Sequence, residues 1–537
     1  MAHAQAATMP RRDQGLQGPS QAPAACSATP APEQAPLMAD PLRFCKHKYI
    51  TLPAVCAVCT MPVSQGLALS KLRFSLKFMF WFKNSLPNAL YSQTRLQQLP
   101  QIPVKASDYT VLERPTSFHQ RILELISQAR ERIMMTMLYL QDDEAGNEIM
   151  QALYEAQKRN PQLYIRVYVD FHRAQRGLIG GKGEQRTNAQ MYASYAADVD
   201  HPPAVYGVPV KRRELFGVMH LKGFVFDDTV LYSGASINKV YLNYNKEKYR
   251  LDRYHEIHSR ELADTMCHYT NEAFHQNFAV QDFSQGNIRP ARDIRGEIKA
   301  LQRSLARSQY SFKSSRRIKD DEVGITPLAG LGKRNNQLNR SILWALDSAR
   351  KQIFICTPYF NPPRILQEHL EMALDRDVEV TIVVGDKVAN DFYIPPEQNF
   401  STIGAIPYVY EQNLRDLLTR QHRHIESGKL NVYLWRDGIN TYHLKGIFID
   451  RHLAVITGNN LNPRAWGLDL ENGLFVHDPN HLLQEKFMHE KQYILRHTTR
   501  MNSVNDLEKF EDYPEQVQKI LKKVRRLRAS FILKKLL

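Results

Sequence analysis

Apolar and polar residues follow the same pattern in two distant stretches of the chain. Residues 119–138 carry apolar side chains at helical spacing, followed by a strand-like run that ends at Tyr139. Residues 341–360 repeat this order, with a run that ends at Tyr359. The spaced apolar residues are Ile122, Leu125, Ile126 and Ala129, and then Ile342, Ala345, Leu346 and Ala349. Each stretch therefore predicts a helix that leads into a buried strand.

Two more pairs of segments extend the parallel. LYIRVYVD at 163–170 and VEVTIVVGD at 378–386 are short β-branched runs that end in Asp, and they predict buried strands of an α/β sheet. HLKGFVFD at 220–227 and HLKGIFID at 443–450 are nearly identical octapeptides with β-prone residues. Because helix, strand, strand and octapeptide recur in the same order with nearly constant spacing, the chain contains an internal duplication.

The duplication predicts an α/β fold made of two similar domains, each a mixed sheet flanked by helices. We place the first domain at 95–285 and the second at 326–505. The segment between them, 286–325, predicts a basic helical linker, and 506–537 predicts a basic amphipathic tail. The apolar face of the linker helix is made of Ile294, Ile298, Leu301 and Leu305, and its basic face of Arg295, Lys299, Arg303 and Arg307.

Residues 1–94 precede the duplicated part and are interpreted as an extension. Residues 1–40 are rich in Ala, Pro and Gln and predict disorder. Residues 49–69 carry no charge, so a membrane span is one interpretation, but two prolines interrupt a stretch that is barely long enough to span. We favour another interpretation, in which Met79 is the true start of the protein.

The composition is that of an ordinary globular protein, but the formal net charge of +16 is unusual. Such a charge indicates an acidic partner: nucleic acid, an anionic membrane surface or a phosphorylated substrate. Six cysteines imply no disulfide framework. We predict no metal and no cofactor. The one candidate zinc cluster matches no common structural spacing: Cys45, His47, Cys56 and Cys59.

Each octapeptide holds a His and a Lys two residues apart. Alternate side chains of a strand point to one face, so His220 and Lys222 should point together, as should His443 and Lys445. Two imidazoles and two ammonium groups in a common cleft suit a phosphodiester. One histidine would attack phosphorus, and the other would protonate the leaving oxygen and then deprotonate the acceptor. The lysines would neutralise the phosphoryl oxygens.

Supporting residues lie at the end of each octapeptide and downstream of it. We expect Asp227 and Asp450 to orient the site through hydrogen bonds or ion pairs and to take no part in the chemistry. GASIN at 234–238 and GNNLN at 458–462 place small and amide residues at matching positions, which favour turns but also suit phosphate binding. The candidate phosphate donors are Ser236, Asn238, Asn460 and Asn462.

Paired HxKxxxxD motifs followed by G-x-[SN]-x-N resemble the phospholipase D superfamily. Over roughly residues 95–537 the chain is similar to the bacterial phosphatidylserine synthases of that superfamily. The segments that carry this likeness are DFHRAQRG at 170–177, VYGVPV at 205–210, LYSGASIN at 231–238, TPYFNPP at 357–363, ANDFYIP at 389–395 and TGNNLNPRAWGLDLEN at 457–472.

The resemblance implies two domains related by a pseudo-twofold axis around one site. It also implies transfer of a phosphatidyl group from CDP-diacylglycerol to L-serine, with release of CMP, through a phosphatidyl-histidine. We assign His220 as the nucleophile and His443 as the acid and base, although the symmetry leaves the reverse assignment open.

The basic tail predicts contact with a membrane. Val517, Ile520, Leu521, Val524 and Leu527 recur at helical spacing. Such a helix is typical of segments that lie in an anionic interface, so we expect peripheral attachment to the inner face of the cytoplasmic membrane. The alternative is a helix packed on the domain with its charges solvated. The predicted membrane-binding residues are Lys519, Lys522, Lys523, Arg525, Arg526, Arg528, Lys534 and Lys535.

Other functions fit some of these features. The positive charge would bind other polyanions, and the family resemblance implies association with ribosomes. A phosphodiesterase or nuclease of the same superfamily fits the paired motifs equally well, and only the family-specific segments oppose it. A cardiolipin synthase uses the same chemistry but usually begins with two membrane-spanning helices. A non-enzymatic surface-binding protein is opposed by the intact His and Lys in both octapeptides.

Overall fold

The computed structural model describes residues 89–177, 186–312, 316–395 and 397–526, which all belong to one compact unit within 72–537. Among these residues, no helix is both long enough and apolar enough to cross a membrane. Some predictions fall outside the described ranges: those for residues 1–88, including 49–69, Met79 and the cysteine cluster, and those for Arg528, Lys534 and Lys535.

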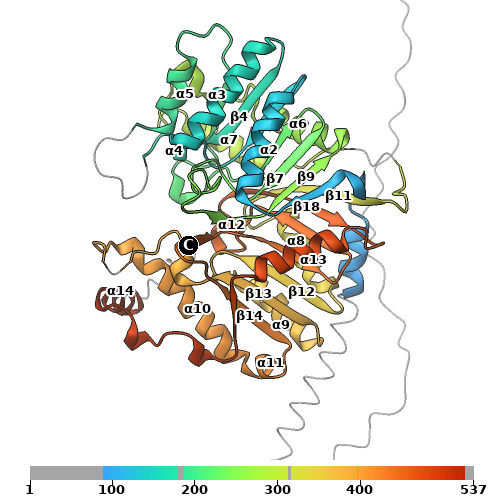
Figure 1. Cartoon of the computed structure of the whole chain (residues 1–537), viewed down its shortest axis with the longest axis vertical. Coiled ribbons are helices and arrows are strands. Elements are labelled where there is room, and N and C mark those ends of the chain that lie inside the picture. The colour runs from blue at the N-terminus through green and yellow to red at the C-terminus, as the bar shows by residue number, and fades with distance from the viewer. Residues whose placement is uncertain (1–88, 178–185, 313–315, 396, 527–537) are drawn as a thin grey trace, which may run out of the picture. The chain divides into compact units, whose positions relative to one another are not determined.

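The first half forms an eight-stranded mixed sheet flanked by helices (Figure 1). Its strands, in sheet order, are β10 (Gln281–Asp282), β5 (Ala204–Val208), β4 (Tyr164–Asp170), β3 (Arg132–Thr136), β6 (Gly223–Phe226), β7 (Thr229–Ser233), β9 (Tyr254–His258) and β2 (Tyr109–Leu112). Its helices are α2 (Pro115–Gln128), α3 (Glu144–Arg159), α4 (Phe171–Ala174), α5 (Asn188–Ala196) and α6 (Arg260–Phe274).

The second half forms a nine-stranded mixed sheet. Its strands, in sheet order, are β1 (Ile102–Lys105), β11 (Glu322–Leu331), β18 (Leu470–His477), β17 (Leu453–Thr457), β16 (Gly446–Ile449), β12 (Gln352–Thr357), β13 (Glu379–Gly385), β14 (Leu430–Trp435) and β19 (Thr498–Met501). Its helices are α8 (Gln337–Ser348), α9 (Arg364–Asp375), α10 (Ile406–Arg420), α11 (His422–Glu426), α12 (Pro463–Gly467) and α13 (Gln484–Leu495).

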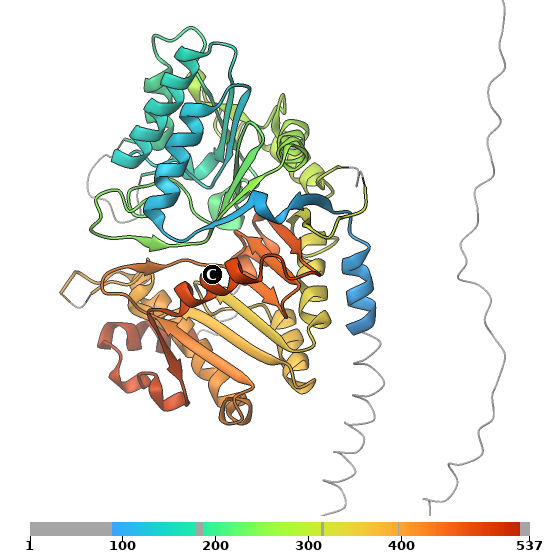
Figure 2. The same ribbon diagram turned by 45° about the vertical axis from the view of Figure 1, so that its right-hand side comes forward.

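The two sheets have the same topology. In the first, β3, β4 and β5 run parallel, and β3 pairs antiparallel with β6. In the second, β12, β13 and β14 run parallel, and β12 pairs antiparallel with β16; Figure 2 shows these parallel strands side by side in yellow to orange. The predicted α/β fold with two duplicated mixed sheets is therefore confirmed, as are the four buried strands inferred from apolar runs.

One domain boundary needs correction. Residues 102–105, which we placed in the first domain, form β1 and pair with β11 of the second sheet, with Ile102 opposite Ile325. A strand of four residues carries no local signal of its partner, so its sheet was not predictable. The linker helix α7 (Arg295–Leu305) forms as expected and buries Ile298, Leu301 and Leu305.

The halves meet through short backbone pairings. β8 (Arg250–Leu251) of the first half pairs in parallel with β15 (Thr441–Tyr442) of the second. At the equivalent place, Met219 forms a parallel bridge with Leu470. The His443 amide donates to the Leu251 carbonyl at 2.8 Å, and the His220 amide donates to the Leu470 carbonyl at 2.9 Å. Each octapeptide histidine is thus anchored to the opposite half of the molecule.

Candidate active site

The local chain path places each His and Lys just before a buried strand. β6 and β16 begin at Gly223 and Gly446, whose φ angles of 115° and 145° lie in the region that favours glycine. The four side chains are buried, with 1–7% of their surface exposed: His220, Lys222, His443 and Lys445. A glycine after each lysine therefore lets the chain turn from the site into the strand.

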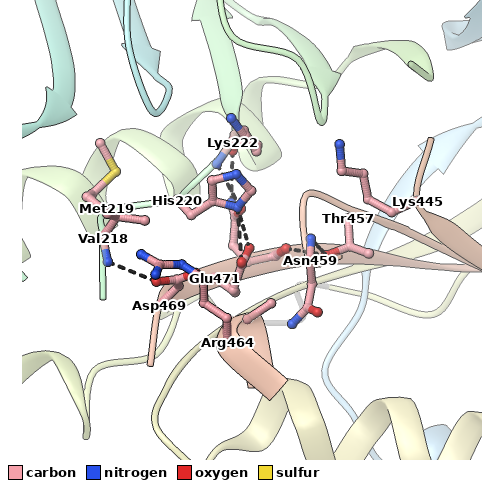
Figure 3. Close-up of polar contacts among 12 residues, drawn as sticks. Val218, Met219, His220, Lys222, Lys445, Thr457, Asn459, Arg464, Asp469 and Glu471 are labelled. Carbon is pink, nitrogen blue, oxygen red and sulfur yellow. Dashed lines mark hydrogen bonds and ion pairs between the residues drawn. The ribbon is translucent and has the colours of Figure 1, made fainter. Parts of the chain in front are cut away.

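Each histidine is paired with a carboxylate from the other half. Both carboxyl oxygens of Glu471, on β18, lie 3.0 Å from Nδ1 of His220 (Figure 3). In the second octapeptide, Nδ1 of His443 lies 3.1 Å from Oδ2 of Asp252, which follows β8. The two carboxylates occupy equivalent positions of the duplication, 219 residues apart. The site is therefore shared: neither half contains a complete histidine–carboxylate pair.

Sequence reasoning missed both carboxylates. Glu471 lies inside the family-specific segment 457–472, where it was given no role, and Asp252 lies in no recognised motif. The two carboxylates stand 219 residues apart, with Asp252 two residues before β9 and Glu471 as the second residue of β18. The spacing of the carboxylates differs from the 223 residues between the octapeptides. Only the three-dimensional structure therefore shows which carboxylate pairs with which histidine.

Burial keeps both imidazoles neutral at neutral pH. Burial and then the positive charges of Lys222 and Lys445 lower the pKa of His220 well below 6.5. Burial and then Lys445 lower the pKa of His443 to about 4. A neutral imidazole whose Nδ1–H is held by a carboxylate presents the lone pair of Nε2, which a nucleophile or a general base requires.

The carboxylates respond differently to the site. Burial raises the pKa of Glu471 well above its usual range, despite the two nearby lysines. Burial alone would also raise the pKa of Asp252, but Lys445 and His443 outweigh it and lower that pKa. Asp252 is thus ionised, whereas the positive charge that develops on His220 during attack on phosphorus favours the ionised form of Glu471.

The lysine ammonium groups lie close enough to sense each other. Burial and then the charge of Lys445 lower the pKa of Lys222 to about 7. Nζ of Lys222 donates to Oγ of Ser236 at 3.2 Å, and Nζ of Lys445 donates to Oδ2 of Asp252 at 2.9 Å. Two buried lysine cations in one site favour an anion with several oxygens, such as a phosphoryl group.

The predicted phosphate donors divide into two kinds. Ser236 contacts Lys222, and Oδ1 of Asn460 is buried without a hydrogen-bond partner among the described residues. The other two hold local structure: Oδ1 of Asn238 accepts the Tyr241 amide, and Oδ1 of Asn462 accepts the Ala465 amide as the N-cap of α12. Ser236 therefore remains the better candidate for a phosphate donor, because the unpartnered Oδ1 of Asn460 can only accept a hydrogen bond.

Asp227 and Asp450 do not lie in the site, contrary to the expected orienting role. The Asp227 carboxylate accepts the amides of Arg130, Glu131 and Arg132 at 2.8–2.9 Å, at the far end of β6. Asp450 does the same for residues 350–352 at 2.8–3.1 Å. Each lies five positions after its lysine along extended chain, about 16 Å at the usual rise. These carboxylates fix the turn between helix and strand.

The backbone around His220 is braced by further buried groups. The Met219 amide donates to Oδ2 of Asp170 at 2.9 Å. The Val218 amide donates to Oδ1 of Asp469 at 2.9 Å (Figure 3). Asn472 accepts the Lys222 amide through Oδ1 and donates to the Lys222 carbonyl through Nδ2, both at 2.9 Å. The position of the octapeptide is therefore fixed by both halves.

The tail helix α14 (Glu515–Arg526) is not a free amphipathic helix. Val517 and Leu521 are buried against Ala405, Tyr408 and neighbouring residues of the second half. Two of the five apolar residues predicted to enter the membrane are thus covered by protein. The basic residues of the described part are exposed: Lys519, Lys522, Lys523, Arg525 and Arg526.

Comparison with known proteins places this geometry in a family. A sequence profile described as "Cardiolipin synthase, PLD-like domain" matches residues 122–273 and again 342–490. The chain is 46% identical over 450 residues to the CDP-diacylglycerol–serine O-phosphatidyltransferase of Haemophilus influenzae, covering 83% of this chain and 98% of that protein. The chain belongs to this phosphatidyltransferase family of the phospholipase D type. The resemblance inferred from the motifs is confirmed.

Other members of the family agree. The chain is 42% identical over 448 residues to the CDP-diacylglycerol–serine O-phosphatidyltransferase PssA of Escherichia coli K12, covering 83% of this chain and 98% of that protein. A crystal structure of phosphatidylserine synthase from Haemophilus influenzae matches with a TM-score of 0.80 and 45% identity, covering 84% of this chain and 99% of that chain. The likeness to this phosphatidyltransferase family thus extends over the whole length of its members.

Proposed function

We propose that this protein is a phosphatidylserine synthase, which transfers the phosphatidyl group of CDP-diacylglycerol to the hydroxyl of L-serine and releases CMP. The relatives named for this reaction support the substrates. The observation that carries the chemistry is the pair of neutral histidines, each held by a carboxylate of the opposite half, beside two buried lysines.

In the first step, Nε2 of His220 attacks the phosphorus that bears the diacylglycerol. A phosphorus–nitrogen bond forms while the bond to the CMP oxygen breaks, and CMP leaves with that electron pair. The imidazole becomes cationic as it is phosphorylated, so the adjacent Glu471 carboxylate stabilises it. Lys222 and Lys445 neutralise the phosphoryl oxygens.

In the second step, the serine hydroxyl attacks the same phosphorus. His443 takes the hydroxyl proton through Nε2, the ring nitrogen that Asp252 does not hold, and the phosphorus–nitrogen bond to His220 breaks as phosphatidylserine forms. The different partners of the two rings support this assignment. Nδ1 of His220 faces both oxygens of one carboxylate, whereas His443 also contacts the Tyr241 hydroxyl at 2.9 Å and the ammonium of Lys445.

CDP-diacylglycerol resides in a bilayer, so the enzyme must reach a membrane surface. We infer that the exposed basic residues of α14 bind the anionic inner face of the cytoplasmic membrane through charge. Each basic residue near such a surface contributes about 1 kcal/mol, and salt weakens this attraction. Binding to anionic vesicles that falls steeply with salt supports this; binding that ignores salt would indicate an apolar contact instead. Ribosomes offer a similar polyanionic surface.

The proposed reaction is tested with purified protein and CDP-diacylglycerol in mixed micelles. CMP release is followed with and without L-serine, and the lipid product is identified. Serine-dependent release that yields phosphatidylserine and is lost in His220→Ala supports the synthase. Release that ignores serine and yields phosphatidic acid would make the protein a phosphodiesterase. Phosphatidylglycerol as the preferred acceptor would make it a cardiolipin synthase.

A further inference from the structure

The two halves of the site differ at one equivalent position. Arg250 precedes Asp252 by two residues, and at the same distance before Glu471 stands Asp469. Nε of Arg464 holds Asp469 at 3.2 Å, so the first octapeptide faces a neutralised carboxylate. The second octapeptide faces Arg250, whose ion-pair partner Asp391 is held less closely, with Nη1 and Oδ2 3.6 Å apart. A duplicated site that takes two different substrates needs such a difference, because identical halves would bind identical groups.

The register of β8 and β15 fixes Arg250 beside the second histidine. Thr441 is the partner of Arg250, and Nε of Arg250 donates to Oγ of Thr441 at 3.2 Å. Two residues further along, Asp252 contacts His443. Alternate residues of a strand share a face, so Arg250 lies on the same side as Asp252, with its Cα about 6–7 Å along the strand. The Tyr241 ring lies between Arg250 and His443: its centroid is 4.9 Å from Cζ of Arg250 and 5.5 Å from the imidazole centroid.

A carboxylate completes this corner of the site. Oδ2 of Asp391 lies 3.6 Å from Nη1 of Arg250, and Oδ1 accepts the Tyr359 hydroxyl at 2.7 Å. The ring of Tyr359 lies 5.9 Å from that of His443. Asp391 and Tyr359 come from the segments ANDFYIP and TPYFNPP, to which the phosphoryl chemistry assigns no role. Two family-specific segments thus converge on the second histidine.

The Arg250–Asp391 pair is open to a ligand. Its 3.6 Å separation exceeds the roughly 2.7–2.9 Å of a direct charge-assisted hydrogen bond. The side chains of Arg250 and Asp391 are 17% and 21% exposed. Burial raises the pKa of Asp391, but the charge of Arg250 outweighs burial and lowers that pKa. Arg250 and Asp391 thus present a cation and an anion to solvent, close to His443, without a direct hydrogen bond between them. Such a pair suits a ligand that carries both charges.

We propose that Arg250 and Asp391 form the subsite for the amino-acid acceptor, with the guanidinium binding its carboxylate and Asp391 binding its ammonium. This inference rests on the proposed synthase function. An L-serine held by both charges places its hydroxyl, one carbon from the α-carbon, toward His443. A nucleotide pyrophosphate fits the corner poorly, because Asp391 would repel it. Water and simple alcohols lack both charges, so the pair also favours serine over hydrolysis.

The test deletes one charge from the enzyme and the matching charge from the acceptor. Serinol is serine without the carboxylate, and glycerate is serine without the ammonium. Arg250→Gln should raise the KM for L-serine about tenfold or more, as expected for a lost charge-assisted hydrogen bond, but change that for serinol less than twofold. Asp391→Asn should raise the KM for L-serine similarly and leave that for glycerate unchanged. For an analogue that yields no product, the inhibition constant against L-serine is measured in place of the KM.

Two controls separate this subsite from a structural ion pair. Exchange of labelled CMP into CDP-diacylglycerol reports the first step without serine, so the ratio of synthesis to exchange at fixed serine should fall about tenfold in both variants. Asp391→Asn preserves the shape of the side chain and guards against misfolding of Arg250→Gln. Asp377→Asn, at the other end of β13 and 80% exposed, is the matched control and should leave the ratio unchanged.

The outcomes are distinct. An unchanged KM for L-serine in Asp391→Asn, or equal losses with serine and glycerate, would overturn the assignment of Asp391 to the ammonium. Equal losses with serine and serinol in Arg250→Gln would overturn the assignment of Arg250 to the carboxylate. A wild-type protein that exchanges CMP but makes no phosphatidylserine contradicts the proposed function itself.

Discussion

Replacement of Glu471 by glutamine probes the pairing between the halves. The side chain is 1% exposed and both its oxygens lie 3.0 Å from Nδ1 of His220, so glutamine keeps the shape and removes the charge. A hydrogen bond to a charged group is worth about 1.5–3 kcal/mol. The positive charge on His220 develops only during attack on phosphorus, so the lost interaction energy raises the activation barrier. The expected decrease in kcat is about 10- to 140-fold.

The assay compares CMP exchange with phosphatidylserine synthesis in Glu471→Gln, using Glu485→Gln on the exposed face of α13 as the control. We predict that exchange and synthesis fall by the same factor, because His220 acts in the step that both share. Asp252→Asn should depress synthesis more than exchange, since His443 receives the serine proton. A Glu471→Gln enzyme with wild-type exchange would refute the role of a charged carboxylate behind His220.

Three further predictions concern a proton, a turn and the tail. The pKa of Lys222 in the free enzyme is lowered to about 7, so its ammonium cation is present below that pH and is lost above it. Because this cation neutralises the phosphoryl oxygens, kcat/KM for CDP-diacylglycerol should fall tenfold per pH unit above about 7. A flat profile to pH 9 would contradict this. Asp227→Ala removes the carboxylate that accepts three backbone amides, so it should lower the free energy of unfolding in urea by about 1–3 kcal/mol while kcat stays within twofold. A large loss of kcat would restore a catalytic role. Val517→Ala removes two buried methyl groups, about 1–2 kcal/mol, and should speed tryptic cleavage of α14; unchanged cleavage would mean that Val517 does not dock the helix.

Local patterns in the sequence were sufficient to predict the duplicated architecture. Apolar spacing located α2 and α8 and the strands that follow them, although β3 ends three residues before Tyr139 and β12 two before Tyr359. These elements follow from burial of one helix face or of a whole strand, and both leave a periodic trace along the chain.

Contacts between distant residues were not predictable in the same way. Asp252 and Glu471 reach their histidines across the two halves, so no spacing within either half relates them. The octapeptide pattern suggested that Asp227 belongs with His220, but a strand carries the carboxylate to its opposite end. The sequence also could not reveal that Val517 is covered, because an amphipathic helix has the same pattern whether it docks on protein or on lipid.

The most direct measurement follows the phosphatidyl phosphorus itself. Enzyme is mixed with CDP-diacylglycerol labelled at that phosphorus, quenched within milliseconds and digested, and the labelled peptide is identified before and after a chase with L-serine. We predict label on the peptide that contains His220, moving quantitatively into phosphatidylserine during the chase. Protein that never carries label, or label that leaves as phosphatidic acid at a rate independent of serine, would contradict a synthase that acts through a phosphatidyl-histidine.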